Sequence, residues 1–282
     1  MTRHLDSSMP KLEPLQSCRS DRGSSSLNAR DRSSLGVQSH GALIVADVRS
    51  LSISFVSENV ESVCASPPDI VLGADLGRCF DRAQRHALVN AMSGGDAAGT
   101  TRDVGAFTLG DRALWVSAFV ADPFTVFQFE PILPNEPPSH MTLRDLSLLL
   151  HELQSADNVD GLFQITASLL RMLTGYDRVL FVADTSTGVG RVVAESAAGG
   201  LGQSLDLLGP PIAGWAQDQK DPLAYVADVD SQPTTMLKAD ADLSDFDLSG
   251  VPLGVASEPI RDALRCSGHR GAMNLRVSVA DR

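Results

Sequence analysis

The chain has 282 residues, of which 43% are hydrophobic, and it carries a formal net charge of −12 at pH 7. This length is sufficient for two domains, each with its own hydrophobic core. No apolar run approaches the roughly 20 residues that span a bilayer. Residues 1–34 also lack the apolar segment of a secretory signal. We therefore expect neither a membrane-spanning nor a secreted protein, and we expect a cytoplasmic location.

The negative charge is concentrated in the body of the chain. Residues 1–35 contain six Lys/Arg and four Asp/Glu, so this segment has a net charge of +2 and the rest of the chain has −14. An acidic body repels phosphate backbones and anionic lipids. We expect neither nucleic-acid binding nor membrane binding. The four cysteines show no C-x-x-C spacing, which is consistent with reduced thiols.

The N-terminal part of the chain predicts a tail followed by a first domain. Residues 1–35 are polar and rich in Ser and Arg, which predicts a disordered or extended tail. Hydrophobic patterns then predict a helical stretch from residue 57, a helix over 75–91, and strands over 41–47, 51–57, 103–109, 112–121 and 125–131. Two strands, short helices and a three-stranded meander are the element order of a PAS domain. We place this domain at residues 36–131.

The remaining chain predicts a linker and a second domain. Prolines at residues 132–141 predict an extended linker. Beyond it, the patterns predict helices over 142–154, 158–174 and 258–267, strands over 177–183, 190–196 and 272–279, and a long irregular region before the last helix. This is the order of a GAF domain, placed at residues 142–282 and expected to end before its last strand. The predicted fold class is α+β, with each domain an antiparallel sheet flanked by helices.

Several segments resemble the bacteriophytochromes, in which a PAS domain precedes a GAF domain. Cys18 followed by His40-Gly41 and a strand resembles the entry to that family. Three segments of the second domain add to the resemblance: Leu173-Thr174-Gly175-Tyr176-Asp177-Arg178-Val179, Arg191-Val192-Val193-Ala194-Glu195, and Asp221-Pro222-Leu223-Ala224-Tyr225 with the residues up to Asp230. The likeness covers about residues 12–282. Taken in order, these segments are more specific evidence for a PAS domain followed by a GAF domain than for either domain alone.

The resemblance implies a chromophore and a set of residues around it. In that family the N-terminal cysteine carries a bilin, so Cys18 is the candidate attachment point and biliverdin the expected cofactor. The candidate pocket residues are His40, Ile212, Tyr225, Ser257 and Ile260. The family's N-terminal segment also threads a loop of the GAF domain. Residues 19–33 look like an insertion, because the family spacing from the cysteine to His-Gly is shorter.

This sequence departs from the family at positions that hold the chromophore. Ala224 and Gly254 stand where the family has arginines that pair with the bilin propionates, and Ile260 stands where it has a histidine. No aspartate occurs in the segment around Ile212, where the family has one that contacts the pyrrole nitrogens. A buried carboxylate without a partner costs several kcal/mol. Arg261 and Arg270 are candidates to replace one lost arginine.

Two functions are therefore open. The first is a red/far-red photoreceptor that binds biliverdin through Cys18 and signals by a conformational change to a downstream protein. The alternative is a PAS–GAF module without bilin that acts in protein interaction or senses another small ligand. We expect no enzymatic activity, because no catalytic set such as Ser/His/Asp is evident. We also expect no metal site, because the acidic residues at 240–247 lack an EF-hand pattern.

One helix has two interpretations. Its apolar stripe includes Leu143, Leu146, Leu150 and Leu153. This stripe either packs on the GAF sheet or forms the seam of a homodimer. The sequence alone leaves both open.

Overall fold

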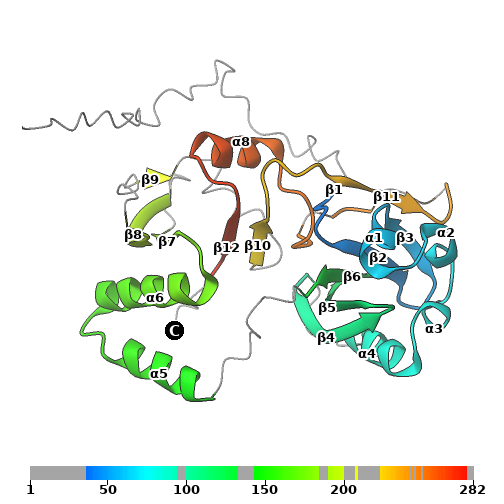
Figure 1. Ribbon diagram of the computed structural model, residues 1–282, viewed down its shortest axis with the longest axis horizontal. Coiled ribbons are helices and arrows are strands. Elements are labelled where there is room, and N and C mark those ends of the chain that lie inside the picture. Colours follow the sequence, from blue (N-terminus) through cyan, green and yellow to red (C-terminus); the bar gives the residue numbers. More distant parts are fainter. Residues whose placement is uncertain are drawn as a thin grey trace, which may run out of the picture.

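The computed structural model describes residues 36–93, 99–132, 143–183, 190–199, 207–208, 223–241, 243, 246–248 and 250–277. Figure 1 shows two halves side by side along the long axis of the molecule. We call residues 36–132 the first half and residues 143–277 the second half. None of the helices in the described ranges is long and apolar enough to cross a bilayer.

The first half is built on a seven-stranded antiparallel sheet. Its own strands are β1 (Gly36–Val37), β2 (Ala42–Asp47), β3 (Ile53–Ser57), β4 (Thr101–Leu109), β5 (Arg112–Ala121) and β6 (Phe124–Pro131). The helices are α1 (Val60–Cys64), α2 (Pro68–Val71), α3 (Leu76–Cys79) and α4 (Arg82–Met92). The strand order is β1-β11-β3-β2-β6-β5-β4, in which β11 (Thr234–Lys238) comes from the second half.

Both faces of this sheet are buried. Residues 42–46 of β2 are each at most 1% exposed, because their side chains point alternately to two different cores. One face packs under the helices of the first half, in a core that includes Ile44, Leu88 and Phe129. The opposite face packs against Leu248, Val251 and Leu253 of the second half. The second half therefore completes the core of the first.

The helix predicted over residues 75–91 is divided into α3 and α4. Asp81 caps the second piece. Its carboxylate accepts a hydrogen bond from the Gln84 N–H at 2.8 Å, and the Gln84 side chain accepts one from the Asp81 N–H at 3.1 Å. This reciprocal capping box starts a new helix at Arg82. The apolar periodicity was continuous across the break, so the prediction missed it.

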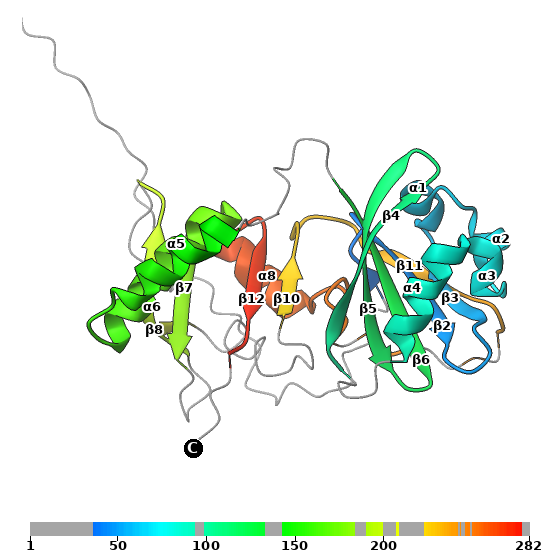
Figure 2. The same ribbon diagram turned by 90° about the horizontal axis from the view of Figure 1, so that it is seen from below.

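The second half contains two helical layers and two small sheets. Its elements are α5 (Leu143–Gln154), α6 (Val159–Thr174), β7 (Arg178–Ala183), β8 (Gly190–Ala197), β9 (Leu207–Leu208), β10 (Leu223–Val226), α8 (Glu258–Cys266) and β12 (Ala272–Leu275). The sheets are β7-β8-β9 and β10-β12. Figure 2 shows α5 and α6 on one side of the strands, with α8 behind them. Phe163 of α6 stacks on Phe181 of β7 with ring centroids 5.2 Å apart.

The boundaries of α6 follow from its end residues. The Asn158 side chain accepts a hydrogen bond from the Gly161 N–H at 2.8 Å and caps the first turn. Gly175 ends the helix in a left-handed conformation with φ of 72°, which glycine adopts without steric cost. The predicted end of this helix at residue 174 is confirmed.

The irregular region predicted before α8 contains two strands that the sequence pattern did not reveal. β10 pairs with β12, and β11 leaves the second half to pair with β3 and β1 of the first. The partners of β11 lie about 180 residues earlier in the chain, and short-range periodicity carries no information about such pairing. The predicted fold class, antiparallel sheets flanked by helices in an α+β arrangement, is confirmed.

We predict that Leu253→Ala destabilises the protein by about 2–5 kcal/mol, because this side chain is fully buried where the second half covers the first sheet. Ile70→Ala is the matched control, since Ile70 is 64% exposed, and it should change stability by less than about 0.5 kcal/mol. Urea unfolding of both variants measures the difference. Equal effects would show that the contact between the halves contributes little.

Candidate functional site

The structure places four of the six predicted site residues, and they come from different parts of the fold: His40, Tyr225, Ser257 and Ile260. The other two lie outside the described residues: Cys18 and Ile212. The described four fall into two groups. His40 and Tyr225 meet at the junction of the two halves, whereas Ser257 and Ile260 lie at the start of α8.

The segment before His40 is enclosed by a loop of the second half. We call residues 227–256, which connect β10 to α8, the enclosing loop. On one side, Gly36 and Val37 pair with Thr235 and Thr234 of β11. On the other side, the Val255 N–H donates to the Gly36 carbonyl at 3.0 Å, and residue 37 bridges to residue 254. Residues 36–38 thus lie between the two arms of the enclosing loop.

The Gln38 side chain holds both arms of this loop. Its amide nitrogen donates to the carbonyl of Tyr225 at 2.9 Å and lies 3.2 and 3.3 Å from those of Pro252 and Gly254. Its amide oxygen accepts a hydrogen bond from the Ala227 N–H at 2.9 Å. Gln38 is 7% exposed, so these main-chain groups have little access to water. A buried polar group without a partner costs about 1–3 kcal/mol, so the Gln38 amide stabilises the enclosure.

A polar cluster beside Gln38 connects the two halves through side chains. The Tyr225 hydroxyl donates to Glu130 Oε2 at 2.9 Å. His40 Nε2 lies 3.6 Å from the same oxygen, and the rings of His40 and Tyr225 are 5.7 Å apart. Glu130 belongs to β6 of the first half and Tyr225 to β10 of the second. The sequence identified His40 and Tyr225 but missed the carboxylate between them.

The surroundings of Tyr225 keep its hydroxyl protonated. Burial raises the pKa of Tyr225 well above its ordinary value of 10, and the neighbouring Glu130 carboxylate raises it further. The hydroxyl therefore acts as a hydrogen-bond donor. This suits a structural contact between the halves and gives no indication of a proton-transfer role.

The first turn of α8 presents Ser257 and Ile260 differently. Ser257 is exposed at the N-cap position, and its side chain makes no capping hydrogen bond. Ile260 packs against a small core formed by Ala224, Val226 and Leu264 between β10 and α8. The side chain that stands in place of the family's histidine is therefore part of an apolar core.

We tested whether the described residues suit the two carboxylates of a bilin. Ala224 is 5% exposed and contributes to the apolar core against α8, so a charged side chain has no room there. A Cβ atom on Gly254 would lie 2.9 Å from the carbonyl oxygens of Leu248 and Val251. An arginine at residue 254 would therefore require the backbone to move. Neither position can supply the missing cation.

The two arginines predicted as substitutes are already engaged by the protein. Arg261 is 9% exposed and donates to the main-chain carbonyls of Val229 and Ser231. Arg270 pairs with Asp228 at 3.1 Å on the surface. The prediction that one of them takes over a propionate finds no support here. Among the described residues, the positions matched to the family do not fit bilin carboxylates.

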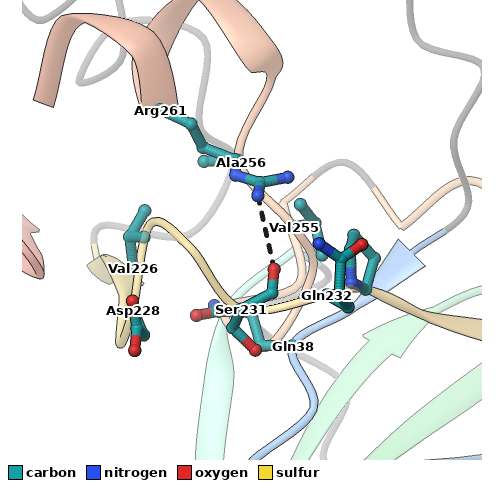
Figure 3. A pocket seen from close by; sticks show the side chains of 9 residues that line it. Gln38, Val226, Asp228, Ser231, Gln232, Val255, Ala256 and Arg261 are labelled. Carbon is teal, nitrogen blue, oxygen red and sulfur yellow. Dashed lines mark hydrogen bonds between the residues drawn. The ribbon is translucent and has the colours of Figure 1, made fainter. Parts of the chain in front are cut away.

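A small pocket lies between the enclosing loop and α8 (Figure 3). It leaves about 10 Å³ for the centre of a water-sized molecule and is lined by Gln38, Asp228, Ser231 and Arg261 among others. A cavity needs roughly 10–15 Å³ of such space to hold one water molecule. This pocket therefore has room for about one water and not for a tetrapyrrole.

Comparison with known proteins identifies the first domain. Residues 31–132 match the model of the PAS fold family PAS_2. The phytochrome-like protein Cph1 of Synechocystis sp. is 24% identical over 174 residues, which cover 56% of this chain and 22% of that protein. The chain thus spans about a fifth of the length of this curated relative.

Solved structures extend the likeness over both halves. The chromophore-binding domain of the bacteriophytochrome RpBphP3 from R. palustris superimposes with a TM-score of 0.74 at 22% identity, covering 89% of this chain and 84% of that one. The chromophore-binding domain of Stigmatella aurantiaca phytochrome P1 gives a TM-score of 0.71 at 21% identity, with coverages of 84% and 81%. The chain has the PAS–GAF fold of these chromophore-binding domains. The resemblance predicted from the sequence is confirmed.

Sequence reasoning missed the residues that join the two halves of the chain. Gln38 and Glu130 carry no motif of their own, and their partners lie 95 or more residues away in the chain. Gln38 is adjacent to the predicted strand at residue 41, but polarity alone does not distinguish a buried glutamine from an exposed one. Only its burial reveals its function in the fold.

The Tyr225 contact makes a prediction for alkaline pH. Because the folded-state pKa is raised, the stability that protonated Tyr225 contributes is fully present below about pH 10 and is lost as pH rises above it. Tyr225→Phe should therefore lose less stability between pH 9 and 11 than the wild type, although it is less stable by about 1 kcal/mol at pH 8. Urea midpoints at these pH values provide the measurement.

Tyr176→Phe serves as the control for this titration, because Tyr176 is the other tyrosine of the chain and its pKa is also raised by burial. Burial raises the pKa of Tyr176, whereas burial and the Glu130 carboxylate together raise that of Tyr225. Tyr176→Phe should therefore change the pH dependence of stability less than Tyr225→Phe. An alkaline slope of Tyr225→Phe identical to that of the wild type would contradict the buried contact.

Proposed function

We propose that this chain is a phytochrome-like sensory module that signals by a conformational change and has no catalytic activity. The observation that carries the proposal is the PAS–GAF fold, which matches chromophore-binding domains of bacteriophytochromes over 84–89% of this chain. The junction at Gln38, Glu130 and Tyr225 supports it, because a change in the second half can reach the first sheet directly. The output would be read by a downstream signalling protein in the cytoplasm.

In the first version of this function the ligand is a bilin, and the chain is a red/far-red photoreceptor. Cys18 would carry biliverdin as a thioether, and His40, Ile212, Tyr225, Ser257 and Ile260 would line the pocket. Bilins supply absorption in the visible and red when bound. The support for this version is the fold and the position of Cys18 ahead of His40.

The alternative version has no bilin and acts through protein contacts or another small ligand. Two observations favour it: the apolar core around Ala224 and the close approach of main-chain carbonyls to Gly254. At both positions, no positively charged side chain is present to compensate a bilin carboxylate. An uncompensated buried carboxylate weakens binding by several kcal/mol.

Mixing the purified protein with biliverdin distinguishes the two versions. The photoreceptor version predicts a red-shifted absorbance band and a zinc-enhanced fluorescent band on a denaturing gel. Cys18→Ser should abolish the covalent gel signal, while Cys266→Ser, at an exposed thiol in the second half, should retain it. A spectrum identical to that of free biliverdin would exclude the photoreceptor version and leave the alternative.

We further propose a homodimer through α5. Leu150 is 50% exposed on this helix, whereas Leu153 is partly buried. The side chains of Leu143 and Leu146 lie outside the described residues. An exposed apolar face on an amphipathic helix is an energetically favourable surface to cover with a second copy. With a net charge of −12 on the chain, partners of nucleic acid or anionic membrane are not proposed.

Light scattering of Leu150→Glu tests the dimer. The variant should have the mass of a monomer at concentrations where the wild type is dimeric, since a buried carboxylate in the seam has no partner. Ile70→Glu is the matched control, because Ile70 is an equally exposed apolar residue of the first half. An unchanged dimer mass for Leu150→Glu would remove α5 from the interface.

A further inference from the structure

Side chains of helix α8 hold the main chain of the enclosing loop. Arg261, the most buried arginine among the described residues, donates from Nε and Nη2 to the carbonyl of Val229 at 3.2 and 2.8 Å. Its Nη2 also lies 3.3 Å from the carbonyl of Ser231, and Figure 3 shows the guanidinium reaching from α8 to this residue. A guanidinium fork satisfies several carbonyls in one fixed orientation.

Neighbouring charges fix this orientation. Arg265 Nη2 donates to the same Val229 carbonyl, and Arg265 Nε donates to Asp230 at 3.0 Å. Glu258 lies 3.3 Å from Arg261 and accepts from Arg265 at 2.9 Å. The Arg265 hydrogen bond also holds the pKa of Glu258 below its ordinary value, so the carboxylate stays charged at neutral pH. The loop at residues 229–231 is therefore attached to α8 on several atoms.

The other end of this attachment is a strand of the first sheet. Only Gln232 and Pro233 separate Ser231 from β11, and proline fixes its own φ angle, so the connection is short and stiff. β11 is hydrogen-bonded on both sides, to β1 and to β3. At its two ends, the Glu58 N–H donates to the Thr235 carbonyl at 2.9 Å, and the Ala239 N–H donates to the Ser54 carbonyl at 2.9 Å.

We propose that Arg261 is a positioning residue that couples helix α8 to the pairing of β11 with β3. A displacement of α8 in the second half would pull the loop at residues 229–231 and thereby weaken the attachment of β11 to the first sheet. This coupling is a physical connection through which the conformational signal would pass between the halves. That role in signalling rests on the proposed sensory function. Its existence does not depend on any ligand.

Hydrogen exchange of the full chain without ligand tests the coupling. The amide protons of Glu58 and Ala239 report on the β3–β11 pairing. In Arg261→Met, which keeps an apolar stem and removes all donors, they should exchange at least about tenfold faster, equivalent to about 1.4 kcal/mol of local stability. Amides of the β5–β6 ladder, far along the sheet from β11, should change by less than about twofold.

Two further variants serve as references. Arg270→Met removes an 84% exposed arginine that pairs with the same loop through Asp228, and it should leave the Glu58 and Ala239 amides unchanged. Arg261→Lys keeps the charge but not the fork and should give an intermediate increase. If Arg261→Met does not fold, Arg265→Met provides the measurement, with a smaller increase at the same two amides.

Two outcomes would overturn the proposal. Faster exchange confined to residues 229–231, with the Glu58 and Ala239 amides unchanged, would show that Arg261 is a local clamp. Equal acceleration of the β5–β6 ladder would show that Arg261 stabilises the protein as a whole. Since no bilin enters the experiment, failure of the coupling is distinguishable from failure of the photoreceptor version.

Discussion

Main-chain carbonyl and amide groups removed from water must find partners, and in this protein the Gln38 side chain supplies them between two distant parts of the chain. Its amide contacts residues on both arms of the enclosing loop while residues 36–38 pass between these arms. An apolar side chain of the same size would leave these groups unpaired at about 1–3 kcal/mol each. The arrangement of β11, the position of His40 and the covered face of the first sheet all depend on this enclosure.

A consequence is that the two halves share a sheet as well as a surface. β11 lies between β1 and β3. Leu248, Val251 and Leu253 cover the sheet face that the helices of the first half leave open. Pairs of domains joined only by a linker move relative to one another by default. Here a shared ladder and a buried core oppose such movement. Signals between the halves therefore have a direct mechanical connection through hydrogen bonds and packing.

The surroundings of α8 keep the fold of the family without the residues that the family uses to hold its ligand. The PAS–GAF fold is retained, yet Ala224 lies in an apolar core and Gly254 allows no larger side chain without backbone movement. Arg261, one of the two arginines predicted as substitutes, is used to hold the enclosing loop. The same arginine that would compensate a carboxylate in a bilin site is thus committed to the main chain. Fold and ligand chemistry must be established by separate measurements in this protein.

Short-range patterns in the sequence determined which elements exist and which fold they form. The apolar pattern predicted a strand over residues 51–57, where β3 lies, and a helix over residues 158–174, where α6 lies, because side-chain periodicity is a local property. Ordered motifs around His40 and Arg178 then identified the PAS–GAF pair. Only the tertiary structure decided that β11 joins the first sheet, that Gln38 and Glu130 connect the halves, and that Arg261 is occupied. The first two depend on groups that find partners 95 or more residues away in the chain, and the third depends on carbonyls 30 and 32 residues away. No local pattern encodes these choices.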